Sequence, residues 1–419
     1  MFDNDYKFTC TERFLNYVKY DTQSDENSKS FPSTEKQKIL LADLAEELKK
    51  IGLEDAHMDE WGYVMATLPS NLPEGKNKNV PTIALIAHVD TSPSVTGKDV
   101  KPVVHKNYQS GNIKLQNEGR VIKESENPDL KNMKGFDIIT TDGTTLLGAD
   151  DKAGVAEIMD AVNYLVTHPD IRHGVVKVCF TPDEEVGRGT EKIDLKKLGA
   201  KYGYTVDGQS RGEIEIETFS ADAVVIKFIG KNIHPGYAKG KMINSIKIAS
   251  AFIDSLPKEE LSPETTEGRE GYVHPLAFNG NEEQTILRFI IRDFDTDRLK
   301  EHEDLLKNLA EETVKKFTGS KLEFEIIKQY RNMKEVLDSH PKVTEYAVEA
   351  LNRLGIEPIM HPIRGGTDGS KLCFMGLPTP NIFAGGHSFH SQLEWIAKQD
   401  MEMAVRTIVE ICKVWEERG

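Results

Sequence analysis

Cysteine is scarce in this sequence. The chain has four cysteines among 419 residues, Cys10, Cys179, Cys373 and Cys412. No two of them form a Cys-x-x-Cys pair, so the sequence indicates neither a disulfide framework nor a thiolate zinc site. We therefore expect the protein to work in a reducing compartment, the cytoplasm.

Basic residues and long apolar runs are also lacking. The chain carries 53 Lys and Arg against 68 Asp and Glu, a formal charge of −15. With no basic block interleaved with aromatics, this charge excludes nucleic acid and anionic membranes as partners. No apolar run approaches the ~18 residues that span a bilayer, and the acidic N-terminus is unlike a signal peptide. Small ligands or metal cations fit this composition better.

What the sequence does contain predicts a parallel α/β sheet. Residues 82–87 form an apolar run and residues 175–180 form a second one, interrupted by Lys177; both are typical of buried strands, and a helical segment follows Gly148 between them. Strands that alternate with helices predict a largely parallel sheet, and ligands of such sheets bind beyond the carboxyl ends of the strands.

The pattern changes near residue 220. Strands at 223–229, 285–291 and 322–327 alternate with helices at 243–256 and 296–317, and the alternation typical of a parallel sheet resumes at Pro341. We therefore predict an α/β protein of two domains. A domain with a mostly parallel sheet comprises residues 1–218 and 333–419, and an inserted α+β domain comprises residues 219–332.

Polar side chains follow the predicted strands. His88 and Asp90 end the first strand, where Asp90 could orient the imidazole, and Asp183-Glu184-Glu185 follows the second. Acids gathered at one place need a positive partner. Taken singly, His88 also fits an ordinary strand-end histidine, and the acidic triplet also fits a solvated loop.

Two loops add further candidates. The segment 148–154 is too acidic for a phosphate loop, and Asp150 or Asp151 in it could cap a helix, bridge two cations, or do both. The loop 385–390 holds His387 and His390. Asp207 is another acid at a predicted strand end. A parallel sheet would bring six side chains to one rim: His88, Asp150, Glu184, Glu185, Asp207 and His390. Histidines and carboxylates without cysteine suit two ions such as Zn²⁺, Mn²⁺ or Co²⁺ around an activated water, with one glutamate left as general base.

The motifs resemble the peptidase T family. Segments 86–91, 141–154, 180–187 and 234–236 carry the resemblance, and segments 290–295 and 363–369 extend it over nearly the whole chain. These tripeptide aminopeptidases belong to the co-catalytic zinc metallopeptidases, which also include aminoacylases and glutamate carboxypeptidases. The resemblance implies a catalytic domain, an inserted lid and dimerisation domain, a homodimer, and short peptides as substrates.

The resemblance also implies a ligand set for two divalent metal ions, with Zn²⁺ as the first choice and Co²⁺ or Mn²⁺ as alternatives. His88 and Asp207 are implied to hold one ion, and Glu185 and His390 the other. Asp150 bridges them, and the peptide bond that follows it is cis. His387 is a rival to His390, because Ser391 stands where the family often has glycine.

Catalytic and substrate-binding roles follow from the same resemblance. Glu184 is the implied general base, and Asp90 orients the first metal ligand. His234, reaching an active site across the dimer, is implied to stabilise the oxyanion, while Arg292 and Arg364 are implied to bind the substrate carboxylate.

We therefore expect an aminopeptidase that releases the N-terminal residue of tripeptides. Two alternatives remain open. The first is a related deacylase or carboxypeptidase that acts on N-acyl amino acids or dipeptides with the same metals. The second is a non-catalytic scaffold, which predicts a lost ligand or base.

Overall fold

The computed structural model describes every residue except 1, 4, 74, 76–78 and 118. The chain forms two compact units: the first comprises Met1–Ile216, Val336–His361 and Thr367–Gly419, and the second comprises Glu217–Glu335 and Pro362–Gly366. The short segment Pro362–Gly366, which we expected in the larger domain, belongs to the second unit. It does so because β16 (Pro362–Ile363) pairs in parallel with β11 (Glu217–Thr218).

The first unit is built on a sheet with a parallel centre. In the described part of the chain the strand order is β1-β2-β8-β3-β9-β17-β10; β8, β3, β9 and β17 are parallel, and the outer strands are antiparallel. The strands are β1 (His57–Met58), β2 (Val64–Leu68), β3 (Ile83–His88), β8 (Val176–Thr181), β9 (Tyr202–Gly208), β10 (Ile214–Glu215) and β17 (Asn381–Phe383). All six residues of β3 are buried, as its apolar run predicts. The predicted two-domain α/β fold is confirmed.

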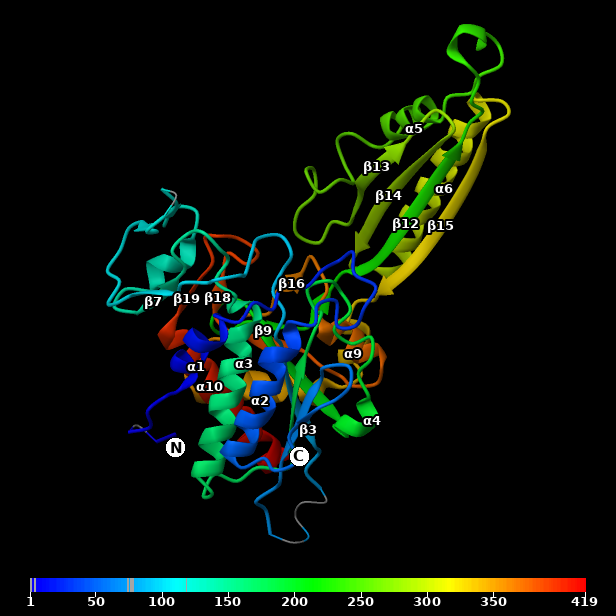
Figure 1. The fold of residues 1–419 in the computed structure, drawn as a ribbon. Helices are drawn as coiled ribbons and strands as arrows, with labels where there is room; N and C mark the ends of the chain where they lie inside the picture. The colour runs from blue at the N-terminus through cyan, green and yellow to red at the C-terminus, as the bar shows by residue number, and fades with distance from the viewer. Residues whose placement is uncertain (1, 4, 74, 76–78, 118) are drawn as a thin grey trace. The chain divides into compact units, whose positions relative to one another are not determined.

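Helix α3 (Ala149–Thr167) packs on β3 and β9 and also contacts α1, α2 and α10 (Figure 1). Its side chains are therefore buried nearly all round, from Val155 to Leu165. The remaining helices of this unit are α1 (Cys10–Tyr17), α2 (Gln37–Ile51), α4 (Leu195–Leu198), α8 (Pro341–Arg353), α9 (Asp368–Phe374) and α10 (Lys398–Arg418), and α7 (Lys334–Leu337) spans the boundary between the units.

A smaller antiparallel sheet in the first unit supports the loop that carries His390. Its strand order is β18-β19-β7-β4. The strands are β4 (Val103–His105), β7 (Ile138–Thr140), β18 (Gly386–His387) and β19 (Trp395–Ala397), with the separate pair β5 (Ile113–Lys114) and β6 (Val121–Ile122) and the short helix η1 (Pro128–Asn132) nearby in sequence. Because β18 and β19 pair with each other, both ends of the loop 388–394 are held.

The second unit is a four-stranded antiparallel sheet of order β13-β14-β12-β15, in contact with α5 and α6 (Figure 1). Its elements are β12 (Ser220–Ile229), η2 (Pro235–Tyr237), α5 (Ser245–Asp254), β13 (Tyr272–Gly280), β14 (Gln284–Asp293), α6 (Thr296–Lys316) and β15 (Lys321–Tyr330). The predicted β-α-β-α-β order was wrong in one respect, because it omitted β13. This edge strand contains Pro275, a shifted register and mostly exposed side chains, so it lacks the alternation of a half-buried strand.

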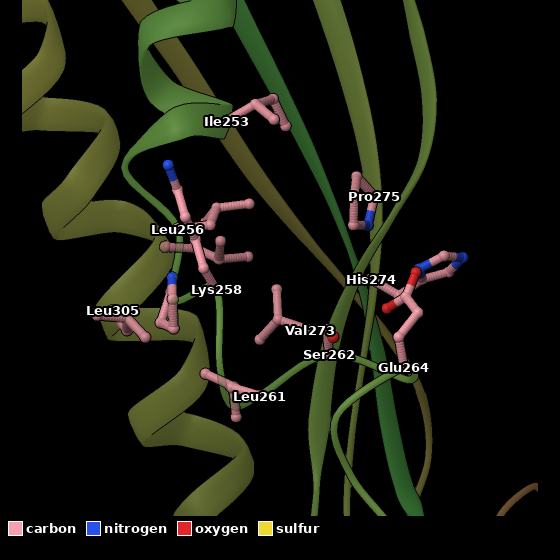
Figure 2. Close-up of a pocket in the computed structure, with 12 residues that line it drawn as sticks. Ile253, Leu256, Lys258, Leu261, Ser262, Glu264, Val273, His274, Pro275 and Leu305 are labelled. Carbon is pink, nitrogen blue, oxygen red and sulfur yellow. The ribbon is translucent and has the colours of Figure 1, made fainter.

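The second unit contains a cavity of about 320 Å³ between α5, α6 and β13 (Figure 2). Leu256, Leu261, Val273 and Leu305 line it, and Val273 belongs to the hydrophobic core of this unit. The cavity therefore borders that core, and Lys258, Glu264 and His274 line it as well (Figure 2). Among the described residues, no helix combines the length and the apolar character that crossing a membrane requires.

Candidate metal centre

The parallel strands bring the predicted side chains to one edge of the central sheet. His88 is the last residue of β3 and pairs with Thr181, the last residue of β8. The acidic triplet begins at Asp183, separated from Thr181 only by Pro182, and Asp207 lies near the end of the neighbouring strand β9. Because these strands are parallel, their carboxyl ends meet at this edge.

Asp150 lies between the two predicted histidines. Its Oδ1 is 2.9 Å from Nε2 of His88, and its Oδ2 is 3.1 Å from Nε2 of His390. Asp207 Oδ1 is 3.6 Å from the same His88 nitrogen, and Glu185 Oε2 is 2.8 Å from the same His390 nitrogen. One carboxylate thus contacts two imidazoles from distant parts of the chain. The peptide bond between Asp150 and Asp151 is cis.

These five side chains form two groups that could each hold a metal ion. The first consists of His88, Asp150 and Asp207, the second of Asp150, Glu185 and His390, and the ligand atoms within each group lie within 4.8 Å of one another. Both groups offer only nitrogen and oxygen, which suits divalent ions such as Zn²⁺, Mn²⁺ and Co²⁺. Buried Glu185 Oε1 has no hydrogen-bond partner among the described residues, so this oxygen is available to bind a cation. The residues therefore fit a pair of divalent ions that share Asp150.

The electrostatics of the centre favour positive charge. Burial lowers the pKa of His88, but the carboxylates of Asp207 and Asp150 outweigh this effect and hold that pKa well above 6.5. Hydrogen bonds to Asp150 and Glu185 raise the pKa of His390 to about 11. Burial opposes ionisation of Asp150, yet the two histidines hold its pKa below 3.8.

The other carboxyl groups of the centre have raised pKa values. Burial, followed by the charge of Asp150, raises the pKa of Glu185 to about 8 and that of Asp207 to about 6. Burial also holds the pKa of Glu184 well above 4.5, although the charge of His88 opposes it. Burial is thus the main cause of these raised pKa values, and the charge of Asp150 adds to it at Glu185 and Asp207.

Asp90 contacts both His88 and the acidic turn. Its carboxylate oxygen Oδ1 is 3.3 Å from Nδ1 of His88, and its backbone oxygen is 3.1 Å from the same nitrogen. The carboxylate also accepts hydrogen bonds from the backbone N–H groups of Glu184 and Glu185, at 3.0 and 3.2 Å. The sequence suggested the contact with the histidine, whereas the contact with the turn depends on the pairing of β3 with β8.

The anchoring role of two carboxylates could not be recognised from the sequence. Asp183, at φ 59°, accepts hydrogen bonds from Ser33 and Gln37 and so fixes the turn that bears Glu184 and Glu185. Glu394 accepts three backbone N–H bonds from the loop around Asp150. The partners of both anchors are far away in sequence, so no local pattern could have identified them.

The structure distinguishes the two candidate histidines of the 385–390 loop. The ring of His387 stacks on Trp395 with the centroids 3.9 Å apart, and its Nδ1 lies 3.5 Å from Asp129. Burial lowers the pKa of His387 to about 4. Of these two histidines, only His390, at φ 57°, belongs to a metal-ligand group of the described residues.

The three predicted substrate-binding residues lie in the second unit. His234 is exposed and its Nδ1 accepts a hydrogen bond from the N–H of Gly236. Arg292 stacks over Tyr330 and donates to the carbonyl of Ile291. Their part in substrate binding stays a prediction.

Arg364, the third of them, was expected in the larger domain. Its guanidinium donates to the carbonyls of Gly268 and Glu270 at 2.9 Å each and to Thr266 Oγ1 at 3.0 Å. It also lies over the ring of Phe219. These contacts give Arg364 a role in holding the loop 266–270, and its part in substrate binding likewise stays a prediction.

Comparisons with known proteins agree with this architecture. Residues 216–318 match the model of the peptidase dimerisation domain. Peptidase T of Geobacillus thermodenitrificans is 52% identical over 408 residues, 97% of this chain and 98% of the relative. Peptidase T of Bacillus subtilis is 50% identical over 406 residues, again 97% and 98%.

Solved structures share the fold at lower identity. An aminopeptidase PepT from Bacillus cereus superposes with a TM-score of 0.73 at 24% identity, covering 97% of this chain and 98% of that one. A tripeptidase from Staphylococcus aureus gives 0.76 at 23%, covering 98% of each chain. A dinuclear metal-binding M20 peptidase from Bacillus subtilis gives 0.65 at 15%, covering 97% and 98%. Identity of about one half to the curated relatives, over nearly their full length, places the chain in the peptidase T family.

Proposed function

We propose that this protein is a metal-dependent aminopeptidase that releases the N-terminal residue from tripeptides. The observation that carries the proposal is Asp150, which is shared by two metal-ligand groups in a chain of the peptidase T family. The alternative activity, a deacylase or carboxypeptidase on the same metals, has no comparable support, since the closely similar curated relatives are named peptidase T.

In this proposal His88 and Asp207 would hold one divalent ion, Glu185 and His390 would hold the other, and Asp150 would contribute to both sites. Zn²⁺ is our first choice, because the ligands are imidazole and carboxylate, with Mn²⁺ or Co²⁺ as alternatives. Bound ions of this kind polarise a substrate carbonyl and increase the acidity of a water molecule.

Glu184 is the proposed general base. It adjoins Glu185 in the chain but belongs to neither ligand group of the described residues, which leaves its carboxylate free to move protons. It accepts a proton from the attacking water and later donates that proton to the nitrogen of the leaving peptide. Asp90 fixes its position through the backbone N–H of Glu184 and orients His88 at the same time.

The second unit supplies the proposed substrate contacts. His234 is exposed on its loop, as the predicted contact with a developing oxyanion requires. Arg292 and Arg364 are proposed to bind the substrate carboxylate, for which a planar guanidinium is suited. A tripeptide length limit is consistent with groups that bind both charged ends of the substrate.

The direct test uses the full chain loaded with Zn²⁺, Mn²⁺ or Co²⁺ and a series of di-, tri- and tetrapeptides. We expect the N-terminal amino acid to be released, fastest from the tripeptide, with mass spectrometry identifying the products. The matched control is the same tripeptide with an N-acetyl group, which an aminopeptidase should not cut. Equal cleavage of both peptides would reject the proposal in favour of the carboxypeptidase, and faster cleavage of N-acyl amino acids would reject it in favour of the deacylase.

We also propose a homodimer formed through the second unit. The match to a dimerisation domain supports this, as does edge strand β13, where Leu276 and Phe278 are 59% and 45% exposed. Light scattering of the protein and of a Leu276→Glu, Phe278→Glu variant tests it, and an unchanged dimer in the variant would exclude this edge.

A cytoplasmic location is proposed as well, supported by four cysteines that are all free and buried.

A further inference from the structure

Glu394 is a buried carboxylate that the proposed mechanism does not use. It is 1% exposed and lies in the loop between His390 and β19. We propose that Glu394 is a positioning residue that holds the bridging carboxylate of Asp150 in place for both metal ions. This inference rests on the proposed function, because it assumes that Asp150 is a metal ligand.

The geometry of Glu394 is that of a backbone clamp. Oε2 accepts hydrogen bonds from the N–H groups of Leu147 at 2.7 Å and Gly148 at 2.8 Å. Oε1 accepts a third from the N–H of Asp150 at 3.1 Å. Both carboxylate oxygens are therefore engaged with one short segment that lies about 245 residues earlier in the chain.

The start of α3 needs such an external acceptor. The first N–H groups of a helix have no partner within the helix, and here the N-cap residue is Gly148, which has no side chain to provide one. Asp150 (φ −85°, ψ 102°) and Asp151 (φ −125°, ψ 34°) also depart from helical geometry. Glu394 therefore supplies the acceptor for the N–H of Asp150 in this first turn, while Asp151 Oδ1 accepts from the N–H of Gly154 at 3.1 Å.

Glu394 also connects the segments that carry Asp150 and His390, two of the three residues in the second ligand group. It lies four residues after His390, whose Nε2 is 3.1 Å from Asp150 Oδ2. The N–H of Glu394 bonds to the carbonyl of Ser391, which keeps this loop compact. One side chain thus sets the position of the bridging ligand relative to the histidine that shares its ion.

The test compares Zn²⁺ affinity in the full chain and in Glu394→Gln, by competition with a chromogenic chelator. Gln has the size of Glu, but its amide NH₂ group must face at least one of the backbone N–H donors. We expect about 10- to 100-fold weaker binding of Zn²⁺, the usual effect of losing a group that orients a ligand. At limiting Zn²⁺ kcat should fall more than KM changes.

Asp160→Asn is the matched control. Asp160 is equally buried, lies in the same helix α3, and accepts backbone N–H bonds from Thr9 and Cys10. It lies ten residues after Asp150, away from the ligands. This variant should lower the melting temperature of the metal-free protein about as much as Glu394→Gln does, yet keep the Zn²⁺ affinity of the original chain.

Equal Zn²⁺ affinity in Glu394→Gln and the original chain would overturn the inference, and so would an equal loss in Asp160→Asn. If Glu394→Gln does not fold, Glu394→Asp takes its place, since it keeps the charge on a side chain one methylene shorter, and undiminished affinity there overturns the inference as well. The tripeptide assay of the original chain is read separately. An inactive chain whose Zn²⁺ affinity still depends on Glu394 would reject the proposed function and leave the clamp standing.

Discussion

The neighbouring residues Glu184 and Glu185 offer a sharp test of the proposed mechanism. The Gln variants keep the size of each side chain and remove its charge, yet we expect them to fail in different ways. Glu185→Gln should release one metal ion, because Glu185 Oε2 contacts His390 Nε2 at 2.8 Å within a ligand group. Glu184→Gln should keep both ions and lose turnover.

The size of the Glu184 effect follows from its role. General acid–base catalysis contributes about 10²- to 10⁴-fold, so kcat should fall by that factor, or by about 2.7–5.4 kcal/mol in activation free energy. The fold should tolerate the change, because the Asp90 carboxylate bonds to the backbone N–H of Glu184 and not to its side chain.

The assay measures metal per chain by elemental analysis and kcat on a tripeptide for the original protein and both variants. Loss of metal in Glu184→Gln, or turnover within a few-fold of the original, would refute the base assignment. Full metal content in Glu185→Gln would remove that residue from the ligand set. A common loss of both metal and activity would mean that the turn acts only as a structural unit.

Three further predictions concern stability and metal binding. Burial, with the charges of Asp400 and Asp160, raises the pKa of Glu157, so the folded state keeps a proton that the unfolded chain loses. The free energy of unfolding should therefore fall as the pH rises above 4.5, and it should fall less in Glu157→Gln. Urea unfolding at about pH 5 and pH 8 measures this change, and an equal change in both proteins would contradict the prediction. His390→Gln should lower Zn²⁺ affinity by at least about 10-fold while His387→Gln leaves it unchanged, and the reverse result in a chelator competition would exchange their roles. Removing metal with a chelator should lower the free energy of unfolding by about 2.7 kcal/mol for each site, if the free metal concentration was about 100 times the Kd of that site. An unchanged melting temperature would count against tight binding.

Much of the metal centre could be predicted from local sequence. The apolar runs that become β3 and β8 are followed directly by polar residues, and parallel strands place such residues at one edge of a sheet. The resemblance to peptidase T then distinguished ligands from ordinary acids. The resemblance favoured His390 over His387, and in the structure His390 contacts Asp150 and Glu185, whereas His387 stacks on Trp395.

The second unit was harder to predict. Strand β13 pairs on one side only and is mostly exposed, so burial imposes no regular pattern on its residues. Arg364 was expected in the larger domain because it follows the point where the α/β alternation resumes. The parallel pairing of β16 with β11 brings it into the second unit instead, and no property of the segment itself encodes that pairing.

The amino-acid sequence by itself determined the family, the two-domain α/β plan and which residue types would meet at the strand ends, since hydrophobic period and motif order are local properties. Only the tertiary structure decided which side chains hold the centre together. Glu394, Asp183 and Asp90 accept hydrogen bonds from residues that lie roughly 95 to 250 positions away in the chain. The sequence around a carboxylate does not show which backbone N–H groups will donate to it, because those partners come close only when the strands pair.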